Sequence, residues 1–137
     1  MNIKECRERL FDHSKIRMPV WARETAPGVK ISDLEDYMGT VAVARGDLGE
    51  AVLWADSVRI ELEEKWEAIE GWEQIIGSGA NKATGPQIMR AKAQIDRGTY
   101  DALRETKWVI AQLREQIRRL EKDEENASRR YTLITGS

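Results

Sequence analysis

Cations and aromatic side chains alternate between residues 82 and 108, and this combination suits single-stranded nucleic acid. Lysine and arginine pair with phosphates, while tyrosine and tryptophan rings stack on bases. The predicted nucleic-acid-binding residues are Lys82, Arg90, Lys92, Arg97, Tyr100, Arg104, Lys107 and Trp108. The same cations can instead pair with the acidic segment 31–76, which holds 12 acids and 3 bases. Both interpretations stay open from the sequence.

No other group of residues has the spacing that catalysis or metal binding requires. The stretch GSGANKATG at residues 77–85 lacks the Gly-Lys-Ser/Thr step of a phosphate-binding loop, and it follows an amphipathic helix instead of a strand. One histidine and one cysteine cannot build a zinc site. Asp12, His13 and Ser14 are neighbours in sequence, whereas a catalytic triad converges from separate segments. We therefore expect a protein that is not an enzyme and has no metal, cofactor or small-molecule substrate.

The composition indicates a single domain in a reducing compartment. The chain has 137 residues, of which 34% are charged and 41% hydrophobic, and its net charge is −2. Such a charged fraction favours long solvated helices. The single cysteine, Cys6, excludes an internal disulfide. No apolar run is long enough to span a bilayer, and the first residues, MNIKECRERLF, lack the apolar core of a signal peptide. We expect a cytoplasmic protein without membrane partners.

A heptad pattern predicts a long helix over about residues 33–76. The sequence SDLE, from Ser32 to Glu35, is typical of a capping box at a helix start. From there one apolar position recurs every seven residues, which is the spacing of a coiled-coil seam. The predicted seam residues of this helix are Leu34, Val41, Leu48, Leu62, Trp66, Ile69, Trp72 and Ile76. Because the apolar stripe is wider than one partner helix covers, we also expect a homo-oligomer.

A second long helix is predicted over about residues 87–130, after a turn within residues 77–87. Pro86 suits the first turn of that helix, and the apolar stripe changes phase at DRGTY, residues 96–100. The predicted seam residues of this helix are Leu103, Ile110, Leu113, Ile117 and Leu120. The last residues, YTLITGS, are β-prone, and we expect a tail there in preference to a strand that adds to a partner.

These elements together predict an all-α fold, a long antiparallel helical hairpin that resembles a coiled coil. Before the hairpin, residues 2–12 can form a short amphipathic helix. An irregular arm with Pro19, Pro27 and Gly28 follows over residues 13–31. The predicted division is therefore residues 1–31 for the short helix and arm, and residues 32–137 for the hairpin and tail.

The order of features over residues 34–134 resembles small phage recombination mediators of the UvsY type. After the first long helix come a glycine-rich basic turn with KAT, a short helix, an Asp-x-x-x-Tyr step, and a long helix that ends in Arg-Arg. The resemblance implies a non-enzymatic helical oligomer in a phage-infected bacterial cell. Such a protein binds single-stranded DNA and helps a recombinase displace the single-strand-binding protein. The residues nearest to a match, as phosphate contacts, are Lys82, Arg90, Lys92 and Arg97.

Two other functions agree with the same sequence. A coiled-coil seam is also typical of a phage structural or assembly protein, such as a virion, scaffold or chaperone component. The acidic helix suits a small inhibitor that docks a host protein. Salt-dependent binding of a labelled oligonucleotide distinguishes the DNA-binding function from both alternatives. The sequence assigns no role to the arm at residues 13–31.

Overall fold

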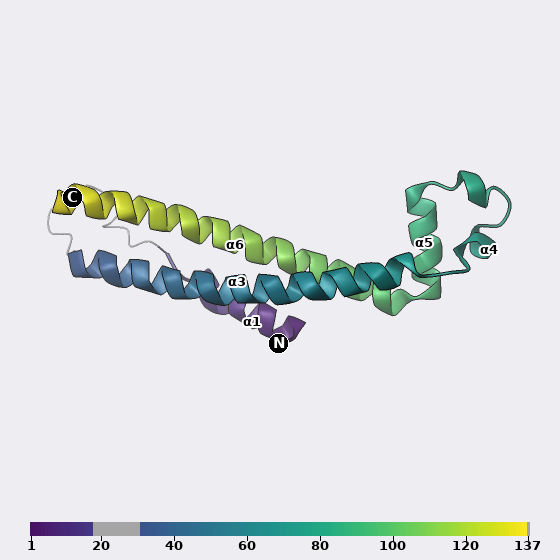
Figure 1. Cartoon of the computed structure of the whole chain (residues 1–137), viewed down its shortest axis with the longest axis horizontal. Helices are drawn as coiled ribbons and strands as arrows, with labels where there is room; N and C mark the ends of the chain where they lie inside the picture. Colours follow the sequence, from purple (N-terminus) through teal and green to yellow (C-terminus); the bar gives the residue numbers. More distant parts are fainter. Residues whose placement is uncertain (18–30, 137) are drawn as a thin grey trace. The chain divides into compact units, whose positions relative to one another are not determined.

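The computed structural model describes residues 1–17 and 31–136, and every regular element in these residues is helical. The elements are α1 (Ile3–Ser14), α3 (Ile31–Glu67), α4 (Trp72–Ile76), the 3-10 helix η1 (Ala80–Lys82), α5 (Gly85–Ile95) and α6 (Arg97–Thr135). The long helices α3 and α6 run antiparallel (Figure 1). The predicted all-α helical hairpin is therefore confirmed. Residues 18–30, most of the predicted arm, lie outside the described residues.

The chain divides into two compact units, and both long helices contribute to each of them. The first unit comprises Met1–Trp54 and Ala111–Ser137, and the second comprises Ala55–Ile110. The first unit therefore holds α1 with the start of α3 and the end of α6, while the second holds α4, η1 and α5 with the remaining parts of the long helices. This division differs from the predicted one at residue 31, because α1 packs onto the hairpin.

The core of the first unit is a heptad seam between α3 and α6. Its fully buried members are Leu34, Val41, Leu48 and Ala51 from α3, and Leu113, Leu120 and Ala127 from α6. Leu34, Val41 and Leu48 recur at intervals of seven on α3, as do Leu113, Leu120 and Ala127 on α6, so each row falls on one face of its helix. Small alanines beside large leucines let the side chains of the two helices interlock. The periodicity in the sequence and the burial in the structure agree here.

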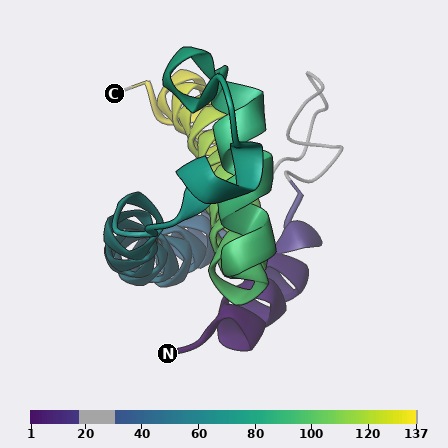
Figure 2. The same cartoon turned by 90° about the vertical axis from the view of Figure 1, so that its right-hand side faces the viewer.

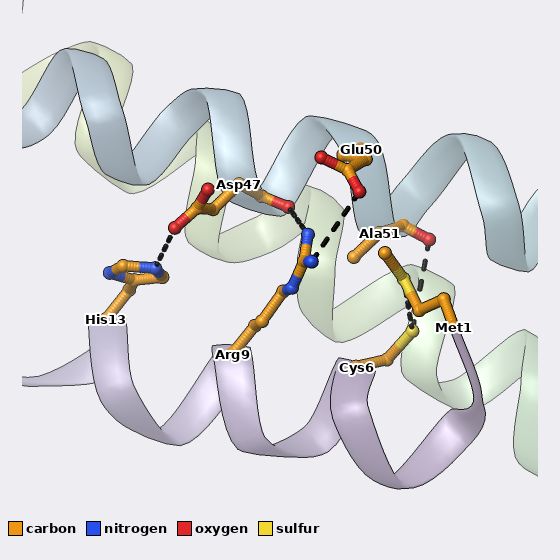
Figure 3. A network of polar contacts seen from close by, with 7 residues as sticks. All are labelled: Met1, Cys6, Arg9, His13, Asp47, Glu50 and Ala51. Atoms are coloured by element: carbon orange, nitrogen blue, oxygen red, sulfur yellow. Dashed lines mark hydrogen bonds and ion pairs between the residues drawn. The ribbon is translucent and has the colours of Figure 1, made fainter.

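Contacts along one face of α1 hold this short helix against α3 (Figure 3). Arg9 donates a 2.9 Å hydrogen bond to the backbone oxygen of Asp47 and pairs with the Glu50 carboxylate at 3.5 Å. His13 lies 3.2 Å from the Asp47 carboxylate. Cys6 is fully buried on the same face, and this burial raises the pKa of its thiol. Intervals of three and four residues place Cys6, Arg9 and His13 on this face.

In the first unit, α6 extends through most of the segment predicted as a tail and ends at Thr135. The Tyr131 hydroxyl donates a 3.2 Å hydrogen bond to the Glu35 carboxylate, and this bond raises the pKa of Tyr131. Arg45 of α3 pairs with Glu124 of α6 at 2.9 Å. These contacts hold the last turns of α6 against the first part of α3. Tertiary contacts thus override the β-propensity of the segment.

The bounds of α3 differ from the predicted helix at both ends. It begins at Ile31, so the predicted cap Ser32 lies inside its first turn. It ends at Glu67. Gly71, just before the next helix, has a φ of 88°, a left-handed conformation that cannot continue a right-handed helix. The separate short helix α4 follows and packs against α5 (Figure 2). Three of the predicted seam residues therefore lie beyond the end of α3, namely Ile69, Trp72 and Ile76. All three are half-buried.

Side-chain caps fix where α5 and α6 begin. The Thr84 hydroxyl accepts a 3.4 Å hydrogen bond from the Gln87 backbone N–H, and the Gln87 side chain accepts one of 2.8 Å from the Thr84 N–H. This pair is the capping box of α5. The Asp96 carboxylate accepts from the Thr99 N–H at 3.0 Å and from the Thr99 hydroxyl at 2.6 Å. The phase change predicted at DRGTY is therefore a break between two helices.

The hydrogen bonds from Thr99, of the hydroxyl first and of the backbone N–H second, lower the pKa of the Asp96 carboxyl. A carboxyl whose folded-state pKa is depressed stabilises the fold above its ordinary pKa, which is about 3.9 for aspartate. That contribution is lost as the pH falls through the lower folded-state value. The cap of α6 is thus fully formed at neutral pH and weakens only in strong acid.

Candidate nucleic-acid interface

Tyr100, near the start of α6 in the second unit, is the centre of a cluster of cations and aromatic rings. The Arg97 and Arg104 guanidiniums lie 5.0 Å and 5.5 Å from the centre of the Tyr100 ring. Arg104 also donates a 3.4 Å hydrogen bond to the Tyr100 hydroxyl. The indole of Trp66, in the last turn of α3, lies 5.8 Å from the phenol ring at an angle of 37°. The tyrosine ring is thus positioned by contacts from two helices.

Helical spacing brings four of the predicted binding residues onto one face of α6. Residues three or four apart on a helix are neighbours, and Arg97, Tyr100, Arg104 and Trp108 follow at intervals of three, four and four. Trp108 is 52% exposed. The exposed ion pair between Arg97 and Asp101, at 3.1 Å, contributes little in water. We call these four residues the Tyr100 face.

A pocket of about 450 Å³ opens beside Tyr100, between α5 and α6. The side chains that line it are Met89, Arg90, Ala93, Gln94, Arg97 and Tyr100. Two arginines and a phenol ring thus line the pocket without a carboxylate. Within residues 1–17 and 31–136, Arg90 makes no ion pair or side-chain hydrogen bond. An anion that entered this pocket would meet only cations and neutral groups.

No protein-family model, curated protein or solved structure matches this chain. The resemblance to UvsY-type mediators therefore stays a prediction from the order of residues. In the part of the chain that the structure describes, no three His, Cys, Asp or Glu side chains gather where they could hold a metal ion.

Membrane spanning needs a helix with both sufficient length and sufficient apolar character. No helix among the described residues combines the two.

Lys92, predicted to contact phosphate, is instead a structural residue. It is only 7% exposed. Its ammonium donates a 3.1 Å hydrogen bond to the backbone oxygen of Trp66 and lies 5.6 Å from the centre of the Trp66 ring. Carbonyls in the last turn of a helix lack partners within the helix, and the helix dipole there favours a cation. Lys92 therefore caps the end of α3, and it is removed from the set of candidate phosphate contacts.

Replacing Lys92 with methionine should lower the free energy of unfolding by about 1.5–3 kcal/mol, because a hydrogen bond from a charged donor contributes this much. Methionine keeps the apolar stem and removes the ammonium. Chemical denaturation measures the change. The control is Arg90→Met, on the same helix and exposed, which should change the free energy by less than about 0.5 kcal/mol. Equal effects of the two substitutions would contradict the capping role of Lys92.

The two remaining predicted contacts, Lys107 and Lys82, are less central to the cluster. Lys107 lies on α6 and pairs with Glu63 of α3 at 3.7 Å, while Glu63 also accepts a 2.8 Å hydrogen bond from Arg59. Lys82 is exposed at the end of η1, after a turn in which Gly79 has a φ of 91°. The structure thus groups Arg90, Arg97, Tyr100 and Arg104, with Trp108 one turn further along α6.

Proposed function

We propose that this chain is a non-enzymatic, oligomeric protein that binds single-stranded DNA as an accessory in phage-like recombination or replication. The observation that carries the proposal is the Tyr100 ring with its two guanidiniums, beside a pocket lined by arginines without a carboxylate. Surfaces that bind single strands combine rings, on which bases stack, with cations that follow the backbone. Duplex DNA keeps its bases inside the stack, so a ring at this position favours the single strand.

In the proposed complex, a base stacks at Tyr100 and the neighbouring arginines contact the phosphates. Arg90 comes from α5, while Arg97 and Arg104 come from α6, so the backbone of the strand meets cations from two helices. Guanidinium planes also stack on bases, which suits arginines that already lie over a ring. Trp108 offers a second ring on the same face of α6. Lys92 takes no part, because its ammonium is bound to the Trp66 carbonyl.

The oligomeric part of the proposal is supported by an exposed apolar face of α3 in the first unit. Val43 and Leu53 on this face are 67% and 74% exposed. Gly39 and Gly46 precede Leu53 at heptad intervals, and a Cβ placed on either glycine meets no atom within 4 Å. Glycine in a helix costs about 1 kcal/mol relative to alanine, so nothing inside the chain favours it here. If the α3 helix of a second copy packed on this face, it would cover Val43 and Leu53, and the two glycines would let the helix backbones approach closely.

Leu53→Asp should convert the oligomer into a monomer, because the new carboxylate would have to be buried between two helices. Sedimentation velocity at micromolar concentration measures the change. Helix content should stay the same, since Leu53 is exposed within its own chain. A wild-type protein that is already monomeric would contradict the oligomeric part of the proposal and leave DNA binding untouched.

The same exposed face of α3 favours a second candidate function, a phage structural or assembly protein. Such a protein needs surfaces that pack on other chains and needs no nucleic-acid site. The protein partners of the first candidate, a recombinase and a single-strand-binding protein, come from the resemblance to UvsY-type mediators. The setting proposed with them is the cytoplasm of a phage-infected bacterial cell, and the assembly function would place the chain in a virion or its precursor.

Tyr100→Leu should weaken the binding of a labelled polythymidine oligonucleotide by about 1–3 kcal/mol, which is the contribution of one stacked base. Tyr100→Phe keeps the ring and should bind nearly as the wild type does. Fluorescence anisotropy at low salt measures both affinities. Equal binding by the leucine and phenylalanine variants would show that no base stacks at Tyr100. Wild-type protein that fails to bind would favour the assembly function.

A further inference from the structure

A second and larger pocket, of about 830 Å³, lies in the second unit between the end of α3, α5 and the start of α6. Its apolar part is formed by Ile60, Trp66, Met89 and Leu103. Ile60 is 50% exposed and Met89 is 43% exposed, although both side chains are large and apolar. Ligand and partner sites are commonly pockets of this size with an apolar lining. Exposed apolar side chains at such a pocket indicate a binding surface.

The α3 wall of this pocket is acidic. Glu63, Glu64 and Glu67 all line it. Glu63 is compensated, because Arg59 lies 2.8 Å and Lys107 lies 3.7 Å from its carboxylate. Within residues 1–17 and 31–136, the carboxylates of Glu64 and Glu67 have no ion pair or hydrogen-bond donor. Uncompensated negative charge beside an apolar surface repels phosphate and attracts a cation.

The opposite wall, on α6, does not neutralise these two carboxylates. Its cations are Arg104, whose guanidinium lies over the Tyr100 ring, and Lys107, which pairs with Glu63. The pocket beside Arg90 has the reverse character, with arginines and no carboxylate. The two pockets share Met89 and Tyr100, so they are adjacent but suit ligands of opposite charge. Tyr100 and Arg104 of the proposed DNA interface lie on one side of the larger pocket, and its acidic α3 wall on the other side is unsuited to DNA.

We propose that the larger pocket binds a segment of a partner protein in which a large aliphatic side chain lies next to lysine or arginine. The aliphatic side chain contacts Ile60, Trp66 and Met89, and the flanking cation pairs with Glu64 and Glu67. Protein interfaces depend mostly on apolar anchors in pockets, and complementary charges at the rim select the partner. This inference goes beyond DNA binding and does not require it.

The probe is a labelled synthetic helical peptide built from leucine and lysine, and its control is the same peptide with glutamate in place of lysine. In fluorescence anisotropy, the wild-type protein should bind the lysine peptide and not the glutamate peptide. Glu64→Gln combined with Glu67→Gln should raise the Kd at least about tenfold, as should Ile60→Ser combined with Met89→Ser. The matched control, Glu61→Gln with Glu70→Gln, removes the same charge from exposed positions outside the pocket and should change the Kd by less than about twofold.

Equal binding of the two peptides would overturn the proposal, and so would an equal loss of affinity in the Glu61 and Glu70 control. If the wild-type protein is an oligomer and the variant with Ile60→Ser and Met89→Ser is a monomer, the pocket is occupied by a second copy of the chain. This result would also overturn the proposal. Circular dichroism of each variant verifies that the helices are intact. Retained oligonucleotide binding by the Glu64 and Glu67 variant would separate this pocket from the Tyr100 face.

Discussion

Leu48→Asp should unfold the first unit and lower the free energy of unfolding by more than about 4 kcal/mol. Leu48 is fully buried in the seam between α3 and α6. The substitution removes a packed leucine and places a carboxylate at a fully buried position of the seam, and both changes are costly. Urea denaturation followed by far-UV circular dichroism measures the loss. At its largest, the effect would remove most of the helical circular dichroism signal even in the absence of urea.

The matched control is Leu53→Asp, because it makes the same substitution on the same helix at a residue that is 74% exposed. It should change the free energy of unfolding by less than about 0.5 kcal/mol. Both variants should be measured at low protein concentration, where self-association does not add to stability. Similar destabilisation by the two substitutions would contradict the assignment of Leu48 to the core and Leu53 to the surface.

Replacing Arg90, Arg97 and Arg104 together with glutamine should weaken single-strand binding and flatten its salt dependence. Each lost phosphate contact should reduce the slope of log affinity against log salt by about 0.7 on a single strand. Three contacts together should therefore reduce the slope by about 2. Arg90 and Arg104 are exposed, and the Arg97 pair with Asp101 is exposed too, so the helices should remain intact. Anisotropy titrations over a range of salt concentrations measure the slope.

The control for this variant replaces Arg118, Lys122 and Arg129 with glutamine. These three cations are exposed on α6 in the first unit, and their removal changes the net charge by the same amount. The slope should then stay within about 0.7 of the wild-type slope. An equal change of slope in the two triple variants would show that the strand is attracted by charge in general and is not bound at Tyr100.

The helical hairpin could be predicted from the sequence because its main signal is local and periodic. The row that begins with Leu34, Val41 and Leu48 is buried in the first unit, and Leu113 and Leu120 form the matching row on α6. The Tyr100 face could be predicted in the same way. Intervals of three and four residues along one helix place its members together whatever the rest of the chain does.

The end of α3 could not be predicted, because the heptad pattern continues beyond it. Trp72 and Ile76 keep the helical phase in sequence, although the backbone has already turned at Gly71. Glycine is compatible with both a helix and a left-handed turn, so its presence alone does not decide between them. Only the packing of α4 on α5 fixes the turn.

The burial of Lys92 also depends on contacts between distant parts of the sequence. Its ammonium reaches the Trp66 carbonyl because α3 ends at Glu67, and this carbonyl then accepts from the Ile69 N–H at 3.3 Å and from Lys92 at 3.1 Å. The one local signal is the pair of small neighbours, Ala91 and Ala93, which are buried with it. The contacts of Arg9 and His13 with Asp47 are likewise non-local, so the docking of α1 was not predicted.

Photocrosslinking tests most directly whether single-stranded DNA binds at Tyr100. A polythymidine oligonucleotide that carries iododeoxyuridine is bound at low salt and irradiated, and the modified residue is then identified by peptide mass spectrometry. We predict adducts at Tyr100 or Trp108, and their loss in the variant without Arg90, Arg97 and Arg104. No adduct at all, or adducts only at aromatic residues outside the second unit, such as Trp54, would contradict the proposed interface.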